Sequence, residues 1–319
     1  MKQVHTPYDD VFRTLLNDCS FLIIPLINEV FGECYTGKEE IRFSPNEHFL
    51  NQQDGEEQER ITDTSFTIMG KETKKYHWEC QSSDDHSMLI RFFEYDAQIA
   101  LDEGRLEGNR LSVTLPHSAV LFLRCSESTP DSLQVEIATP GGTVEYPIPV
   151  MKSQRYTIDE IFEKGLLLLI PFYIFSHESR FHHYNQNPAE RKRLTEEYQY
   201  IMETLEELTQ AKQIDEYTKC TLIDMSKKVL AHIAKNYKNV REGVKMIMGG
   251  KVLEYEAKTI KNEGVQEGRK AGRQEGRQEG RLEMLFDLVR DNLLSLKDAA
   301  ARIGLSEEVF LQKMKEYKM

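Results

Sequence analysis

The alternation of strand-like runs with one amphipathic helix between residues 41 and 125 most constrains the fold of this chain. Short runs rich in β-branched and aromatic residues predict strands at 41–43, 60–69 and 75–81, with Gly70 in the turn between the last two. The next run, "MLIRFFEYDAQIALDEG", has apolar residues at helical spacing, and Gly104 can end that helix. The strand-like "SAVLFLRC" follows. This order predicts a mixed α/β fold.

Further elements flank this region on both sides. The stretch "DDVFRTLLNDCSFLIIPLINEVF" predicts an amphipathic helix that we expect to bend before Pro25. The runs "LQVEIAT" and "TVEYPIPV", joined by Pro140, Gly141 and Gly142, predict a hairpin. Residues 157–260 contain few helix breakers and are expected to be almost entirely helical. The apolar run from Gly165 to Phe175 is far shorter than the roughly 20 residues of a membrane-spanning helix, so it is expected in the core.

Charge and cysteine content limit the classes of function. The formal net charge of −12 argues against binding nucleic acid over the whole surface, which requires clustered Lys and Arg. A nucleic-acid site must therefore be local, or must use metal ions to offset its acidity. The five cysteines include no Cys-x-x-Cys pair, and the N-terminus lacks the pattern of a secretory signal. We therefore expect reduced thiols, a cytoplasmic location and no membrane partner.

The candidate chemistry lies in "ITDTSFTIMGKETKKYHWECQ", residues 61–81. Residues two apart on a strand share a face, so Glu79 and Gln81 are expected on one side and Trp78 and Cys80 on the other. If Asp63 lies at a similar height on the neighbouring strand, its carboxylate and that of Glu79 can share a hard divalent cation. Magnesium held this way keeps waters and open positions for phosphate oxygens. The alternative is that both carboxylates lie on a solvated sheet face.

The element order and several stretches together resemble the PD-(D/E)XK nuclease superfamily, and more specifically the Rpn family of recombination-promoting nucleases and transposase-like proteins. The stretches are "DDVFRTLL", "ITDTSF", "WECQ" and "MLIRFFEYDAQI", supported by the Gly-Arg/Glu tail. The resemblance covers residues 5–175. It implies a restriction-endonuclease-like α/β core with a mainly α-helical C-terminal extension. It also implies an endonuclease that requires Mg²⁺ (or Mn²⁺), acts on DNA and is linked to recombination or mobile elements.

The resemblance assigns roles by position. Asp63 and Glu79 become catalytic metal ligands, with the backbone carbonyl of Cys80 as a third. Gln81 takes the place of the superfamily's lysine. An amide cannot act as a general base, so Gln81 can only orient water or phosphate, and deprotonation of the water is left to the metal.

Two pairs of residues on helices and one histidine have less specific signals. Arg91 and Tyr95, four residues apart on one helical face, can reach a phosphate of DNA; the alternative is a surface arginine beside a packed tyrosine. Asp9 and Arg13 match a pattern of the family, but a helix cap and a solvated side chain explain them almost as well. His77 is expected on the side of Glu79 as a packed or edge histidine and not as a ligand.

The C-terminal part contains an internal repeat, "GVQEGRKAGRQEGRQEGRLE", with glycine at every fourth position from Gly264 to Gly280. Interior glycines and like-charged neighbours weaken a lone helix. Two such helices could meet at the glycine seam and set the Glu flank of one against the Arg flank of the other, which predicts a homo-oligomer. A solvated linker is the alternative.

Beyond the repeat, "SLKDAAARIGLSEEVFLQKMK" predicts two helices around Gly304 with Ser306 as a cap. Helix-turn-helix spacing of this kind sometimes binds DNA, but residues 281–319 balance seven basic against seven acidic residues, which favours a small packing hairpin.

The sequence thus predicts a nuclease-like core at 5–175, a helical region at 176–262, a repeat helix at 263–283 and a helical hairpin at 284–319. The alternative function is a weakly active or inactive nuclease-like scaffold that acts by DNA binding or self-assembly. The acidic charge and the absent lysine favour that alternative. A toxin or defence effector would use the same chemistry in another setting.

Overall fold

The structure is a computed structural model that describes residues 7–43, 47–51, 57–61, 65–82, 88–249, 285–286, 289, 294–302 and 306–316. The chain divides into two compact units, Met1–Ala257 and Lys258–Met319, and each is described here by itself. The first unit combines a mixed β-sheet with helices, so the predicted α/β class is confirmed at this level.

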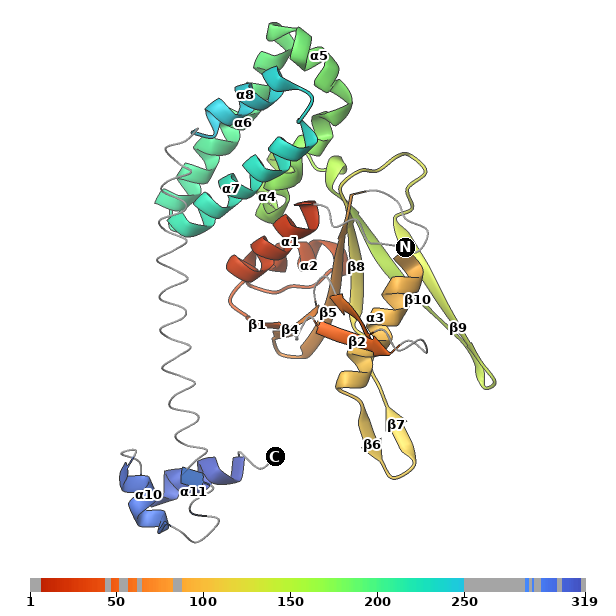
Figure 1. The fold of residues 1–319 in the computed structure, drawn as a ribbon, viewed down its shortest axis with the longest axis vertical. Coiled ribbons are helices and arrows are strands. Elements are labelled where there is room, and N and C mark those ends of the chain that lie inside the picture. Colours follow the sequence, from red (N-terminus) through yellow and green to blue (C-terminus); the bar gives the residue numbers. More distant parts are fainter. Residues whose placement is uncertain are drawn as a thin grey trace. The chain divides into compact units, whose positions relative to one another are not determined.

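A six-stranded sheet forms the centre of the first unit, with the order β1-β4-β5-β8-β10-β9 (Figure 1). Its strands are β1 (Glu40–Phe43), β4 (Ser65–Met69), β5 (Thr73–Gln81), β8 (His117–Phe122), β9 (Ser132–Thr139) and β10 (Gly142–Lys152). The pairs β1/β4 and β4/β5 are antiparallel, the pairs β5/β8 and β8/β10 are parallel, and β9 is antiparallel to β10. The helix α3 (Met88–Asp102) connects β5 to the parallel strand β8.

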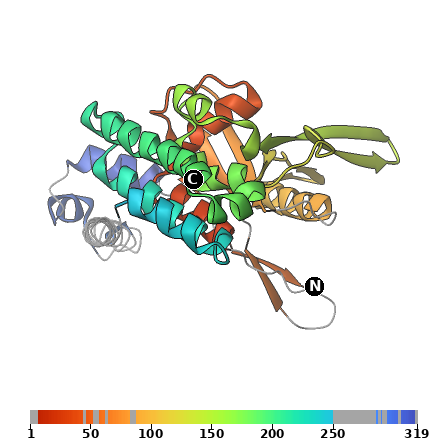
Figure 2. The same cartoon turned by 90° about the horizontal axis from the view of Figure 1, so that it is seen from above.

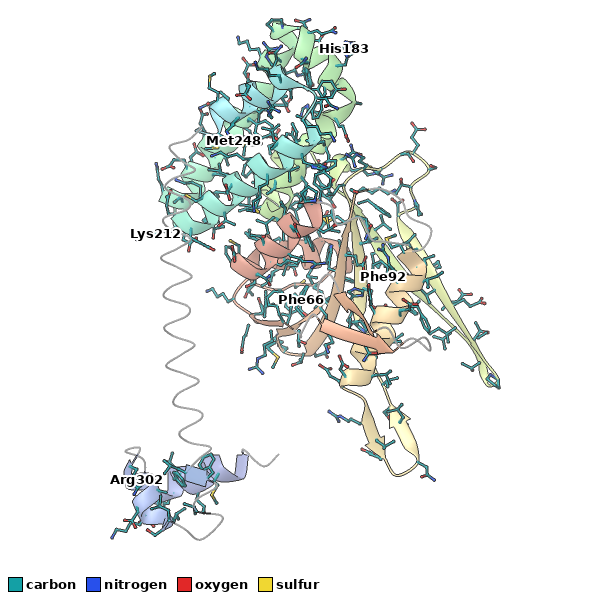
Figure 3. All side chains as sticks on the ribbon, in the orientation of Figure 1. Phe66, Phe92, His183, Lys212, Met248 and Arg302 are labelled. Carbon is teal, nitrogen blue, oxygen red and sulfur yellow. The ribbon has the colours of Figure 1, made fainter. Side chains whose placement is uncertain are left out.

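The two faces of the sheet belong to different hydrophobic clusters. Tyr76, Trp78 and Cys80 of β5 point to the larger cluster, which also contains Phe66 and the helices before the sheet. On the other face, Phe92 of α3 packs against residues of β8 and β10 in a smaller cluster (Figure 3 labels Phe66 and Phe92). The expected alternation along β5 is therefore confirmed, and the intervening residues of β5 face α3.

The chain before the sheet bends before Pro25, as expected, but it forms separate helices and not one bent helix. Helix α1 (Pro7–Asp18) ends before Cys19, a 3₁₀ helix η1 (Ser20–Ile23) follows, and α2 (Ile24–Phe31) begins there; the two arms differ in direction by 114°. Cys19 has φ −140° and ψ 53°, which is not helical. Pro25 lies in the first turn of α2, where its missing N–H costs nothing. The corner buries Leu22 and Ile23.

The strand expected at 60–69 is described in two parts with different neighbours. Strand β3 (Glu57–Ile61) pairs with β2 (Glu47–Asn51) in a separate two-stranded sheet, whereas β4 pairs with β1 and β5. Residues 62–64 between them lie outside the described residues.

A second hairpin that was not predicted follows α3: β6 (Arg105–Glu107) pairs with β7 (Arg110–Ser112). The predicted hairpin of β9 and β10 is confirmed.

The expected helical region is confirmed as far as residue 249, where the continuous description ends (Figure 2). It consists of α4 (Ile158–Glu163), η3 (Leu167–Arg180), α5 (Phe181–Gln186), α6 (Pro188–Gln210), α7 (Glu216–Ile233) and α8 (Lys238–Ile247), and the short 3₁₀ helix η2 (Ser153–Arg155) precedes it. The apolar run at 165–175 is buried in the core as expected, mostly as part of the 3₁₀ helix η3. Residues of α6, α7 and α8 belong to the same large cluster as α1 and the sheet.

Within the described residues, no single helix is long and apolar enough to cross a membrane, although the bent pair of α1 with η1 and α2 meets that criterion in length and composition.

The second unit contains the two predicted helices, α10 (Leu296–Arg302) and α11 (Glu307–Glu316). The backbone N–H of Val309 donates a 3.3 Å hydrogen bond to Oγ of Ser306, so the predicted cap of α11 is confirmed. A small core of its own includes Phe286 and Phe310. The glycine repeat at 263–283 and Gly304 lie outside the described residues.

Candidate functional site

Glu79 lies on β5, the third strand of the sheet, and faces α3. Its side chain is only 1% exposed. The amide of Gln81, two residues further on the same face, donates a 3.0 Å hydrogen bond to Oε2 of Glu79. Nη2 of Arg91, in the first turn of α3, lies 3.9 Å from the same oxygen. Three of the predicted site residues are therefore brought together at one carboxylate.

Asp63, the proposed partner of Glu79, lies outside the described residues. The antiparallel ladder between β4 and β5 is described from Met69, which pairs with Thr73, to Ser65, which pairs with His77. Asp63 precedes Ser65 by two residues, and Glu79 follows His77 by two. Because the described ladder ends at Ser65, it does not test the role of Asp63, which stays a prediction.

Next to Glu79 is a buried polar cluster centred on Asp96 of α3, which is 0% exposed. Nδ1 of His77 and Oγ of Ser118 each lie 2.7 Å from Oδ1 of Asp96, and the hydroxyl of Tyr146 donates to Oδ2 at 3.4 Å. Nε2 of His77 lies 3.8 Å from Oε1 of Glu79. His77 is packed, as expected, and its ring lies between the two carboxylates.

The pKa of Tyr146 is raised, first by burial and then by the charge of Asp96 and the hydrogen bond to it. Both effects of Asp96 favour the protonated phenol, so the hydroxyl stays a donor. Tyr146 lies on β10, Ser118 on β8 and His77 on β5, and these three strands are neighbours in the sheet. Asp96 therefore binds α3 to three adjacent strands.

The remaining predicted residues in the described part of the chain are Tyr95, Cys80, Asp9 and Arg13. Tyr95 is 4% exposed, and its ring lies 6.0 Å from that of His77 in an edge-on arrangement, so it packs against the site; contact of its hydroxyl with phosphate stays a prediction. The side chain of Cys80 lies in the cluster on the opposite face, which leaves its backbone carbonyl as the only group for a metal on the face of Glu79. Asp9 and Arg13 lie within α1, and Asp9 is in its first turn and not at a capping position before it.

The donor groups near Glu79 suit a hard cation in type but are incomplete in number. Among the residues that the structure describes, no group of three or more His, Cys, Asp and Glu side chains is arranged to hold a metal. Glu79 supplies carboxylate oxygens, which Mg²⁺ and Mn²⁺ prefer, and a magnesium site needs only one or two carboxylates together with waters. The residues fit such an ion if Asp63 supplies the second carboxylate.

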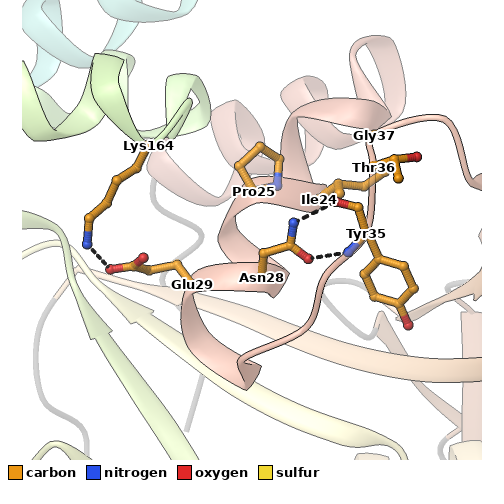
Figure 4. Close-up of a pocket in the computed structure, with 8 residues that line it drawn as sticks. All are labelled: Ile24, Pro25, Asn28, Glu29, Tyr35, Thr36, Gly37 and Lys164. Carbon is orange, nitrogen blue, oxygen red and sulfur yellow. Dashed lines mark hydrogen bonds and ion pairs between the residues drawn. The ribbon is translucent and has the colours of Figure 1, made fainter.

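A pocket on another part of the first unit has different chemistry (Figure 4). It is lined by residues of α2, the loop after it and Lys164. Nζ of Lys164 pairs with Glu29 at 2.5 Å, and the side chain of Asn28 bonds both backbone N–H and C=O of Tyr35 at 2.9 Å. The Asn28 bonds fix the loop on α2, and the Lys164 pair joins the end of α4 to the same helix, so both have a structural role.

Comparisons of the chain with protein-family models, curated proteins and solved structures found no match. Asp96, Ser118 and Tyr146 are the residues of the site that were not predicted. One signal for Asp96 is present in the sequence: it lies four residues after Phe92 and three before Ile99, on the buried stripe of α3. A carboxylate at a core-facing helical position requires buried partners, which points to a polar cluster.

Proposed function

We propose that the chain is a metal-dependent DNA endonuclease with a PD-(D/E)XK-like core, related to the Rpn family and to recombination or mobile elements. The observation that supports this proposal is the convergence of Gln81 and Arg91 on the Glu79 carboxylate, at a position where a helix links two parallel strands. The resemblance assigned Glu79 and Gln81 to one site, Arg91 was expected from its helical position to reach a phosphate, and the three side chains lie together. DNA is the proposed partner.

Each residue has a role in this proposal that follows from its chemistry. Asp63 and Glu79, with the carbonyl of Cys80, would hold Mg²⁺ or Mn²⁺, which when bound supplies a Lewis acid for phosphodiester hydrolysis. Gln81 cannot accept a proton as a base, and its amide orients Glu79 and a water or phosphate oxygen. Arg91 carries a guanidinium that matches the geometry of phosphate oxygens.

The proposal is tested by incubating purified protein with supercoiled plasmid, with and without Mg²⁺ or Mn²⁺. The wild type is expected to nick DNA only with metal. In Asp63→Asn and Glu79→Gln, which keep the side-chain shape, the rate is expected to fall by about a hundredfold or more, because a bound metal contributes several kcal/mol of charge stabilisation.

The matched control is Glu145→Gln, which removes an exposed strand carboxylate on β10 and is expected to cleave like the wild type. Wild-type rates in Asp63→Asn, or cleavage that continues in the presence of EDTA, would contradict the proposal. All variants should first show the wild-type unfolding transition, so that a loss of activity is not a loss of folding.

A scaffold that binds DNA without cutting it is the second candidate function. It is favoured by the near-complete burial of Glu79, by its contacts with Gln81 and Arg91, and by the amide in the place of lysine. A titration with Mn²⁺ followed by calorimetry separates the two candidates. A nuclease site binds the ion and loses it in Glu79→Gln, whereas a scaffold retards DNA in a gel without metal and without product.

A further inference from the structure

The strongest cluster that the proposed function leaves without a role is the buried set of Asp96, His77, Ser118 and Tyr146. We propose that Asp96 and His77 form a positioning pair that fixes the orientation of the Glu79 carboxylate for a hard divalent cation. The inference rests on the proposed function, because it takes Glu79 as a ligand of that cation. It adds two positioning residues that act through Glu79.

Asp96 is held in one place. A buried carboxylate is costly unless donors surround it, and Asp96 receives contacts at both oxygens. Ser118 lies 2.7 Å from Oδ1, and Tyr146 donates to Oδ2. These donors come from β8 and β10, which are paired strands of the sheet. Asp96 is therefore a fixed anchor.

Asp96 in turn fixes the ring of His77. An ionised carboxylate can only accept hydrogen bonds, so the 2.7 Å contact with Asp96 requires Nδ1 of His77 to donate. The ring of Phe92 lies 5.1 Å away at 58°, and that of Tyr95 packs edge-on. With Nδ1 bound and the ring enclosed, Nε2 is the atom that faces Glu79.

Side chains approach the Glu79 carboxylate from two sides. Nε2 of His77 lies 3.8 Å from Oε1, whereas Gln81 and Arg91 contact Oε2. The hydrogen bond from Gln81 at Oε2 and the enclosed His77 ring next to Oε1 restrict how the carboxylate can turn. Partners that orient a ligand typically change metal affinity by about 10- to 100-fold when they are removed.

Substitutions at His77 separate positioning from a merely structural role. His77→Asn keeps an amide near the place of Nδ1, and so keeps the bond to Asp96, but removes the atom that faces Glu79. His77→Gln extends an amide toward the place of Nε2 and so keeps a polar group near Glu79. A structural role is better preserved by asparagine, whereas a positioning role is better preserved by glutamine.

The matched control is a second buried histidine that binds a carboxylate in the helical region. Nε2 of His177 lies 2.8 Å from Glu197, and Nδ1 lies 3.2 Å from the hydroxyl of Tyr184. His177→Asn removes a comparable contact away from the proposed site, so it measures the general effect of such a change on the fold.

The experiment measures Mn²⁺ affinity of the full chain by calorimetry, and the position of Glu79 in crystals of the metal-free variants. Asp96→Asn and His77→Asn are expected to weaken Mn²⁺ binding by about tenfold or more, His77→Gln by only a few-fold, and His177→Asn not at all. The Glu79 carboxylate is expected to be displaced in His77→Asn.

Wild-type affinity in Asp96→Asn and His77→Asn, while Glu79→Gln abolishes binding, would overturn the inference and leave the proposed function intact. If the wild type binds no Mn²⁺, the proposed function fails. In that case the crystals still test whether Asp96 and His77 position Glu79. An unchanged Glu79 in His77→Asn overturns the positioning pair, and a displaced Glu79 supports it.

Discussion

At the scale of single residues, Glu197 illustrates how a buried network makes stability depend on pH. Burial raises the pKa of this carboxyl, but the hydrogen bond and charge of His177, together with the hydrogen bond from Tyr173, lower it more, so its pKa lies below the usual 4.5. A carboxyl whose pKa is depressed in the folded state stabilises the protein at pH values above the pKa of the unfolded chain. That contribution is lost as the pH falls through the lower, folded value.

We therefore predict that Glu197→Gln lowers the free energy of unfolding at about pH 6 by more than at about pH 3.5. At the lower pH the carboxyl of the unfolded chain, with its usual pKa of 4.5, is already mostly protonated, so part of this stabilisation is lost. The measurement is urea unfolding followed by the emission of Trp78, the single tryptophan, which is fully buried. An equal difference between wild type and variant at both pH values would contradict the assignment.

Sequence reasoning predicted only part of the residues at the site. The two-residue period of a strand was enough to place His77 and Gln81 beside Glu79 and Trp78 on the other face. The contact of His77 with Asp96, 19 residues away, depends on how α3 rotates and packs on the sheet. Ser118 and Tyr146 depend on the order of β5, β8 and β10. Packing determines both, and local periodicity does not.

At the scale of elements, the turn between β9 and β10 offers a matched pair of glycines. Gly142 has a φ of 144°, which residues with a side chain rarely adopt. Gly141 has an ordinary φ, and a Cβ added to it would lie 3.8 Å from Oγ1 of Thr139, which is ordinary contact. We predict that Gly142→Ala destabilises the hairpin by about 1–3 kcal/mol, while Gly141→Ala changes it by less than about 0.5 kcal/mol.

The hairpin tip is exposed and can open locally, so the measurement is hydrogen exchange of the amides of β9 and the start of β10. Faster exchange is expected in Gly142→Ala alone. Equal exchange in the two variants would show that the conformation of Gly142 does not hold the turn.

The elements also show which local signals are reliable. The β9–β10 hairpin was predicted because turn residues separate two β-rich runs. A bend before Pro25 was expected, but the interruption of the helix at Cys19 was not, because Leu16, Cys19, Leu22 and Ile23 keep an apolar helical spacing through the corner. All four are buried. An apolar period shows which side chains are buried, but it does not show that the backbone continues in one direction.

At the scale of the whole molecule, each unit has its own hydrophobic core among the described residues. The two clusters of the first unit draw on residues from Tyr8 to Met248, and the cluster of the second unit on residues from Leu285 onward. A unit with its own core can fold independently. A chain ending at residue 262 should therefore keep the unfolding transition of the sheet and its helices, with the same midpoint in thermal circular dichroism.

The same truncation tests the predicted self-association. It removes the repeat in which Gly264, Gly268, Gly272, Gly276 and Gly280 recur every four residues between Glu and Arg flanks. Interior glycines cost a lone helix about 0.8–1 kcal/mol each, and a partner helix across the glycine seam would offset that cost. We predict that light scattering gives a multiple of 37.2 kDa for the full chain and a single-chain mass for the truncated one. The same number of chains per particle in both would exclude the repeat as the site of association, and the glycines would then belong to a solvated linker.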